Sequence, residues 1–229
     1  MKHFFTSFFI IFCEFTFINS SFGNQIEKFN SSSSINSSKI SQEEGSVFKE
    51  VTESCGINYQ GVSFGHAWSD IDLDGYPDLF CTGHGRANLY MNQKDGTFKT
   101  IEVPFIKKVE DDGSIKYYDM HGVTFADVNH DGYPDAYIQL GGDMGHSDGK
   151  QNILFLNHEG MLIFENKAEE YQMIDTLGRG RATLFFDQDK DDYVDFLNVN
   201  FSRPDELFNS SLYSYNSGLE VFDRKIDIG

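Results

Sequence analysis

Three acidic nine-residue segments repeat along this chain without a gap, and they constrain its fold more than any other feature. They are Asp70–Asp78, Asp127–Asp135 and Asp187–Asp195, and their first residues lie 57 and then 60 positions apart. Self-similarity at a near-constant period is typical of repeat architectures, in which each copy forms one supersecondary unit. We therefore expect three copies of one unit.

The spacing of oxygen-bearing residues in each segment matches the ligand pattern of a hard cation. Calcium takes six to eight oxygens, and side chains at positions 1, 3, 5 and 9 with a backbone carbonyl at position 7 surround one ion when the chain turns sharply at position 6. An ion-free acidic turn is the alternative, but it does not explain the fixed spacing of mutually repelling charges. The pattern predicts about three Ca²⁺ ions, held by Asp70, Asp72, Asp74, Tyr76 and Asp78; by Asp127, Asn129, Asp131, Tyr133 and Asp135; and by Asp187, Asp189, Asp191, Tyr193 and Asp195.

Position 6 separates the third segment from the other two. Gly75 and Gly132 supply the sharp turn, whereas Asp192 stands there in the third segment. Aspartate tolerates a left-handed backbone better than most residues but at some strain. We expect the third site to be the weakest.

An EF-hand shares the Asp-x-Asp-x-Asp-Gly pattern but needs a bidentate Glu at position 12 and a helix on each side. Position 12 is Cys81, Ile138 or Asn198 in the three copies. The flanking runs are short, aromatic and rich in β-branched residues, which favours strands. These features exclude the EF-hand.

Each copy is predicted to be a four-stranded antiparallel meander with its acidic segment between strands one and two. Such a unit is a propeller blade, so the fold class is all-β, a partial β-propeller of about three blades. The predicted strands are Val62–Trp68, Gly122–Ala126 and Arg181–Phe186, then Leu79–Cys81, Ala136–Leu140 and Phe196–Val199, then Asn88–Asn92, Asn152–Asn157 and Glu206–Phe208, and last strands containing Phe98, Phe164 and Phe222.

The blades are expected at about 57–104, 117–167 and 178–225 within a propeller region of residues 46–229, preceded by an orphan strand at Val47–Val51. Closed propellers have about four to eight blades, so three do not close a ring. Truncation of a longer chain is the favoured explanation. A ring completed by blades from a second chain and an open three-blade stack are the alternatives.

The sequence resembles the FG-GAP/VCBS repeat family, the calcium-binding blades of integrin α-subunits and of many exported repeat proteins. The resemblance rests on Phe64-Gly65, the three acidic loops and the strands Asn88–Tyr90 and Gly96–Phe98. The segment Val47–Ile57 is similar to the join between blades in the ASPIC/UnbV-associated subgroup. Phe64-Gly65 has no Phe-Gly counterpart in the other copies. The resemblance implies the propeller fold and calcium binding.

The N-terminus has the layout of an export signal. A basic start precedes a short apolar run, and small residues before Asn24 offer a cleavage site, which predicts a signal peptide at 1–23. A retained anchor is the alternative. The run is shorter than the ~20 residues of a membrane span, and we expect no transmembrane span after the leader. We expect residues 24–45 to form an Asn/Ser-rich disordered linker. We expect a secreted, periplasmic or cell-surface protein.

The net charge bears on the class of partner, and the cysteine count bears on disulfide bonding. The 18 Lys and Arg against 36 Asp and Glu give a net charge of −18, which argues against binding to nucleic acid because that needs basic patches. Outside the leader the cysteines are Cys55 and Cys81, and both a bridge and two separate thiols remain open.

Long loops at the ends opposite the acidic segments are the candidate ligand face. Their candidate ligand-binding residues are His84, Arg86, Asp143, His146 and Arg203. We expect an exported, non-catalytic, calcium-binding module for adhesion to, or interaction with, an extracellular protein or glycan. The alternatives are a secreted hydrolase acting on polysaccharide from this loop face, and a truncated fragment of a longer propeller protein.

Overall fold

The computed structural model describes residues 48–104, 107–109, 113, 115–141, 151–175, 178–201 and 210–228. Its contacts divide the chain into two units, Met1–Lys49 and Glu50–Gly229. The predicted signal peptide and linker fall outside the described residues. The described part contains strands and turns but no helix, and so no helix that could cross a membrane.

Two four-stranded antiparallel sheets begin and end the second unit, each with its strands in chain order. Hydrogen bonds between neighbouring strands build both, and the all-β prediction is confirmed. The first sheet is followed by a hairpin of β5 (Lys107–Val109) and β6 (Ile115–Tyr117). The strands of the two sheets are β1 (Ser63–Ser69), β2 (Asp78–Gly83), β3 (Arg86–Asn92) and β4 (Phe98–Glu102), and then β12 (Gly180–Phe186), β13 (Asp195–Asn200), β14 (Ser210–Asn216) and β15 (Val221–Ile228).

The middle sheet has three strands, β7 (Met120–Ala126), β8 (Asp135–Leu140) and β9 (Ile153–Phe155). After it, β10 (Asn157–His158) and β11 (Met161–Leu162) form a separate short hairpin.

The predicted fourth strand at Phe164 is wrong, because a side chain replaces the backbone ladder there. Lys167 N–H donates to the Leu154 carbonyl at 2.9 Å, as a strand partner would. Leu154 N–H, however, donates to the Asn166 side-chain oxygen at 3.0 Å, and that oxygen also accepts the Ala168 N–H at 3.0 Å.

One other predicted strand differs from the structure, and another lies outside the described residues. The described part of the orphan strand, Phe48–Val51, is not a strand but leads into a turn closed by Cys55 N–H donating to the Val51 carbonyl at 2.8 Å. The strand predicted at Glu206–Phe208 lies outside the described residues, and β14 holds the third place in its sheet.

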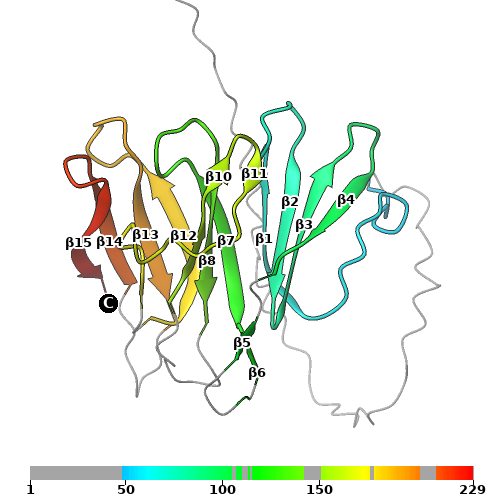
Figure 1. The fold of residues 1–229 in the computed structure, drawn as a ribbon, viewed down its shortest axis with the longest axis horizontal. Coiled ribbons are helices and arrows are strands. Elements are labelled where there is room, and N and C mark those ends of the chain that lie inside the picture. Colours follow the sequence, from blue (N-terminus) through cyan, green and yellow to red (C-terminus); the bar gives the residue numbers. More distant parts are fainter. Residues whose placement is uncertain are drawn as a thin grey trace, which may run out of the picture. The chain divides into compact units, whose positions relative to one another are not determined.

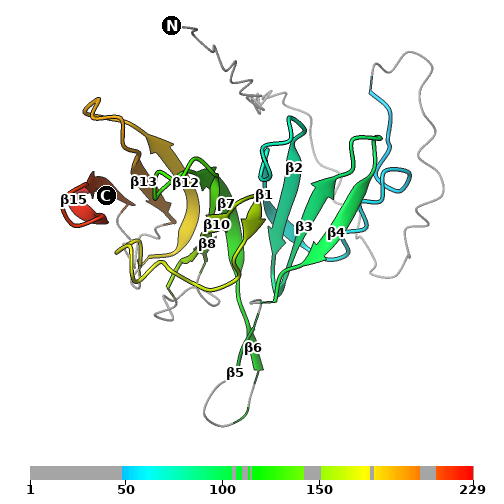
Figure 2. The same cartoon turned by 45° about the horizontal axis from the view of Figure 1, so that its top comes forward.

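The three sheets lie side by side in chain order with their first strands, β1, β7 and β12, next to one another (Figures 1 and 2). Strand β8 is buried along its whole length. Because side chains alternate along a strand, Ala136 and Ile138 join the core shared with the first sheet, whereas Tyr137 joins Phe196 in the core shared with the last. The middle sheet is thus covered on both faces.

The first strands approach at backbone distance where glycine permits it. A Cβ on Gly65 would stand 2.8 Å from the Gly122 Cα, and one on Gly122 would stand 2.7 Å from the Arg181 carbonyl oxygen. All three strands shift register at the same place, leaving Phe64, His121 or Arg181 as the extra residue of a bulge. Phe64-Gly65 therefore does have a structural counterpart, His121-Gly122.

Candidate functional site

The three acidic segments form the loops β1–β2, β7–β8 and β12–β13, which we call loops 1, 2 and 3. All three lie at the same end of their sheets, and the β5–β6 hairpin lies at the other (Figure 1). The alternation of antiparallel strands places them there.

Each loop folds around the carboxylate of its first aspartate, which accepts the backbone N–H groups of positions 5 and 6. The two distances are 2.9 and 2.9 Å for Asp70, 3.1 and 2.9 Å for Asp127, and 3.2 and 3.2 Å for Asp187. Position 6 has a left-handed backbone in every loop, including Asp192 with φ +70°. The three loops therefore share one conformation despite the missing glycine.

The ninth residue of each loop is a buried carboxylate that ties the loop to its sheet. Asp78, Asp135 and Asp195 are 1%, 1% and 2% exposed. One oxygen of each accepts the N–H of position 2 at 2.9–3.0 Å, and the other accepts an N–H at the end of the third strand at 2.7–3.0 Å. Position 9 thus joins three segments of its repeat.

Burial of these carboxylates opposes their negative charge. Burial raises the pKa of Asp135 to about 7, against the lowering effect of the N–H groups of Asn157 and Val128, and it also raises the pKa of Asp78. A cation in the loop would favour the ionised form and offset this cost.

Positions 1, 3 and 9 gather their oxygens in two of the loops. One carboxylate oxygen each from Asp70, Asp72 and Asp78 lie within 4.8 Å of one another, and the same holds for Asp187, Asp189 and Asp195. Oxygens bound to one Ca²⁺ at about 2.3–2.6 Å lie no more than about 5 Å apart, so both sets fit a single hard cation.

The gathered carboxylates of loops 1 and 3 repel one another. Burial raises the pKa of Asp72, and the charges of Asp74 and Asp70 add to the effect. Burial and then the charge of Asp191 likewise raise the pKa of Asp189. A divalent ion would relieve this repulsion in both loops.

Position 5 behaves differently from positions 1, 3 and 9. Its carboxylate accepts the position-7 N–H at 2.9, 2.9 and 3.0 Å in Asp74, Asp131 and Asp191. Asp74 also pairs with Lys94 Nζ at 3.0 Å, and this hydrogen bond lowers the pKa of Asp74. The structure therefore gives position 5 a role in shaping the turn.

Neighbouring loops touch one another through contacts of Asn157 and His130, two side chains that the sequence analysis did not single out. The Asn157 amide donates to the Ile71 carbonyl of loop 1 at 2.8 Å, while its own backbone N–H donates to Asp135 of loop 2. The His130 ring of loop 2 lies 4.2 Å from the Tyr193 ring of loop 3, centroid to centroid. The loops form one continuous edge.

The predicted ligand face is described only in part. Asp143, His146 and Arg203 lie outside the described residues. Arg86 begins β3 with an exposed side chain, and His84 precedes it in the β2–β3 turn, beside Asp119 and His121. Two histidines and a carboxylate thus meet here, from segments the sequence analysis did not connect.

The two cysteines Cys55 and Cys81 are free thiols, so the bridge that the sequence left open is not formed. Burial raises the pKa of the Cys81 thiol to about 11. The protonated thiol is unreactive at neutral pH because the thiolate is the nucleophile.

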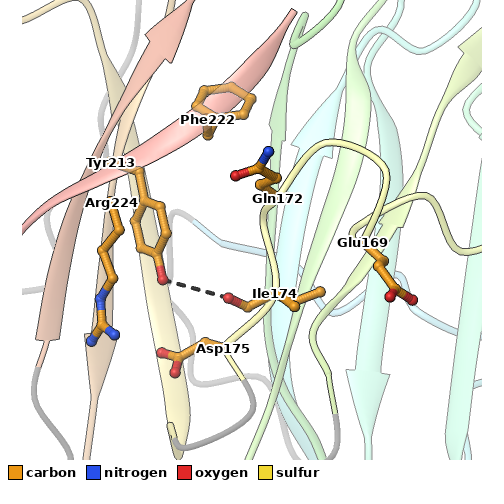
Figure 3. Close-up of a pocket in the computed structure, with 7 residues that line it drawn as sticks. All are labelled: Glu169, Gln172, Ile174, Asp175, Tyr213, Phe222 and Arg224. Atoms are coloured by element: carbon orange, nitrogen blue, oxygen red, sulfur yellow. Dashed lines mark hydrogen bonds between the residues drawn. The ribbon is translucent and has the colours of Figure 1, made fainter. Parts of the chain in front are cut away.

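A pocket of about 260 Å³ lies between residues 169–175 and strands β14 and β15 (Figure 3). The Tyr213 hydroxyl donates to the Ile174 carbonyl at 3.5 Å, and Asp175 accepts the Asn198 amide at 2.8 Å. These contacts attach the segment to the last sheet, so they have a structural role. The lining residues are Glu169, Gln172, Ile174, Asp175, Tyr213, Phe222 and Arg224.

Comparison with known proteins bears on the first two loops. Residues 70–138 match the model of the FG-GAP-like repeat. This stretch begins at the first aspartate of loop 1 and ends within β8. A search of the curated proteins found no match. The match supports assigning the region that holds loops 1 and 2 to the FG-GAP repeat family.

Proposed function

We propose that the protein is an exported, calcium-stabilised β-propeller module that binds an extracellular protein or glycan and performs no catalysis. An FG-GAP repeat suggests a propeller-type interaction module. The observation that carries the calcium proposal is the common geometry of the three loops, with a buried position-9 carboxylate in each. The resemblance of Val47–Ile57 extends the proposal to the ASPIC/UnbV-associated subgroup.

The role of calcium in this proposal is structural. The ion binds the folded loop, where the carboxylates are gathered, far better than it binds the unfolded chain. At 100 times the dissociation constant it adds about 2.7 kcal/mol of stability per independent site. Because Asp78, Asp135 and Asp195 join each loop to two strands, this energy stabilises whole sheets.

Calcium removal tests the structural role. We expect excess chelator to lower the thermal midpoint markedly, and millimolar calcium to restore it. Asp187→Asn should reduce the calcium stoichiometry measured by native mass spectrometry by one ion. Glu102→Gln, an exposed acid outside the loops, is the matched control. An unchanged midpoint in chelator, or an unchanged stoichiometry in Asp187→Asn, would contradict the proposal.

The propeller assignment draws on the sheet arrangement. Three antiparallel sheets stand side by side with β1, β7 and β12 next to one another and glycines at their closest approach, as expected of consecutive blades around an axis. Further blades from the same or a second chain would complete the ring.

Ligand binding is proposed for the face opposite the loops. We expect Arg86→Ala to abolish binding to glycans immobilised on an array, or to a protein ligand identified by crosslinking, while Lys99→Ala, exposed on β4, leaves it intact. Equal binding by both variants would contradict this placement.

Export is proposed from the leader alone. N-terminal sequencing of the mature protein should find a start near Asn24. A mature chain that begins at Met1 would contradict cleavage.

A further inference from the structure

We propose that His84, Asp119 and His121 form a transition-metal site of the zinc type, at the end of the sheets opposite the acidic loops. This site goes beyond the calcium-stabilised module proposed above. It uses different residues and a different donor chemistry.

One donor atom from each of the three side chains lies close to the other two. Nε2 of His84 and Nε2 of His121 are 3.5 Å apart, and both point at the same oxygen, Asp119 Oδ1, with His121 Nε2 at 2.9 Å from it. Two nitrogens bound tetrahedrally to Zn²⁺ at about 2.0–2.1 Å lie about 3.4 Å apart. The histidine pair therefore has the separation of two ligands on one ion.

Two separate backbone segments, the β2–β3 turn and the start of β7, position these side chains. His84 lies in the β2–β3 turn and forms an antiparallel bridge with Asp119, and the adjacent Gly85 N–H donates to the Tyr118 carbonyl at 2.9 Å. His121 is the extra residue of the β7 bulge. Bulges redirect a side chain and are over-represented beside functional sites. The scaffold thus joins the first sheet to the second at the site.

Neighbouring groups hold the imidazoles in place. The Phe64 ring stacks on His84 at 4.3 Å between centroids and lies 4.6 Å from His121. Gly141 is packed against the site so closely that a Cβ would stand 2.6 Å from His121 Nε2 and 2.8 Å from Asp119 Oδ2. Packing of this kind preorganises ligands before an ion arrives.

The donor set distinguishes this site from the loops. Imidazole nitrogen suits Zn²⁺ and similar first-row ions, whereas Ca²⁺ prefers oxygen alone. The Asp119 carboxylate adds an oxygen ligand to the two imidazole nitrogens, a combination that zinc sites use. The side chains of His84, Asp119 and His121 are 53%, 20% and 14% exposed, which leaves a path for an ion and room for a water as fourth ligand.

Cobalt and zinc titrations of the full chain in millimolar calcium test the site, because calcium saturates the acidic loops first. We expect one equivalent of Co²⁺ to produce the intense visible absorption of a tetrahedral site, and Zn²⁺ to displace it. His84→Ala should raise the dissociation constant at least about a hundredfold, since even loss of an outer-shell partner costs about 10- to 100-fold. Asp119→Asn should weaken binding in the same direction.

His158→Ala is the matched control, because His158 is an exposed histidine on β10, away from the proposed site. This variant should bind cobalt as tightly as the unaltered protein does. His84 is more than half exposed, so its replacement leaves the core intact, and an unchanged thermal midpoint in calcium verifies this.

Three results would overturn the proposal: no stoichiometric cobalt binding, a weak octahedral spectrum, or equal binding by His84→Ala and His158→Ala. The cluster would then be a hydrogen-bonded His–Asp–His contact between sheets. Because calcium is held constant, this outcome leaves the calcium proposal unaffected.

Discussion

Six residues of the acidic loops have a left-handed backbone, and only two of them are glycine. Position 6 holds Gly75, Gly132 and Asp192, while position 4 holds Leu73, His130 and Lys190 with φ between +56° and +65°. A left-handed conformation is costly for most L-residues. The loops therefore store strain at position 4 in every copy, which the sequence pattern at position 6 does not reveal.

Asp192→Gly should stabilise the protein by about 0.5–1 kcal/mol, because it removes left-handed strain from loop 3. The reverse exchange, Gly75→Asp, should destabilise it by a similar amount. A Cβ at Gly75 meets no heavy atom within 4 Å, so its effect is conformational rather than steric. Urea unfolding in saturating calcium measures both. A loss of stability in Asp192→Gly would show that the aspartate side chain contributes more than its backbone costs.

At the scale of elements, local patterns predict most of the strands whose backbone groups pair with each other. Alternating side chains and turn residues mark β1 to β3 and β12 to β13 close to their observed bounds, and β4 contains the predicted Phe98. The prediction fails at Phe164, because the Asn166 side chain takes over the hydrogen bonds of a strand. Tertiary contacts decide whether a side chain or a neighbouring strand takes the hydrogen bonds of a backbone segment.

Asn92, the last residue of β3, and Asn157, two residues after β9, occupy similar places in their copies. Each donates from its side-chain amide to the carbonyl of the proline at position 8 of its loop at 3.1 Å. Asn157 is also 1% exposed and donates to the Ile71 carbonyl of the neighbouring loop. The second asparagine thus connects two repeats, and the first belongs to one.

Asn157→Ala should therefore cost about 2–3 kcal/mol of unfolding free energy, because it leaves buried partners unpaired. Asn92→Ala should cost about 1 kcal/mol, since its surroundings are partly solvated. Chemical denaturation of the two variants gives the comparison. Equal losses would mean that the contact between loops 1 and 2 contributes nothing.

At the scale of the whole molecule, strand β8 of the middle sheet is buried along its whole length, whereas the first strands of the flanking sheets each expose a large apolar side chain. Leu184 on β12 is 59% exposed, and Trp68 on β1 is also exposed, whereas Phe185, beside Leu184, packs on Tyr137 and Phe196. Adjacent residues of one strand point to opposite faces. This distribution is that of an array whose ends carry apolar surface.

Phe185→Ala and Leu184→Ala test this arrangement with two neighbouring residues. Truncation of Phe185 removes one aromatic ring from the core between the second and third sheets and should lower the unfolding free energy by about 3 kcal/mol. Truncation of Leu184 should change the unfolding free energy by no more than about 0.5 kcal/mol. Differential scanning calorimetry of dilute protein measures both. A large loss in Leu184→Ala would place a packed neighbour on the outer face.

The sequence by itself determined the acidic loops, the antiparallel order of strands around them and the all-β class, because oxygen spacing and side-chain alternation are local properties of the chain. It also placed the loops at one end of the sheets, since alternating strands leave no other choice. Only the tertiary structure brought His84 to Asp119 and His121, and Asn157 to loop 1. Those meetings depend on how separate sheets pack and on a one-residue bulge that redirects His121, and no pattern within a single repeat encodes either.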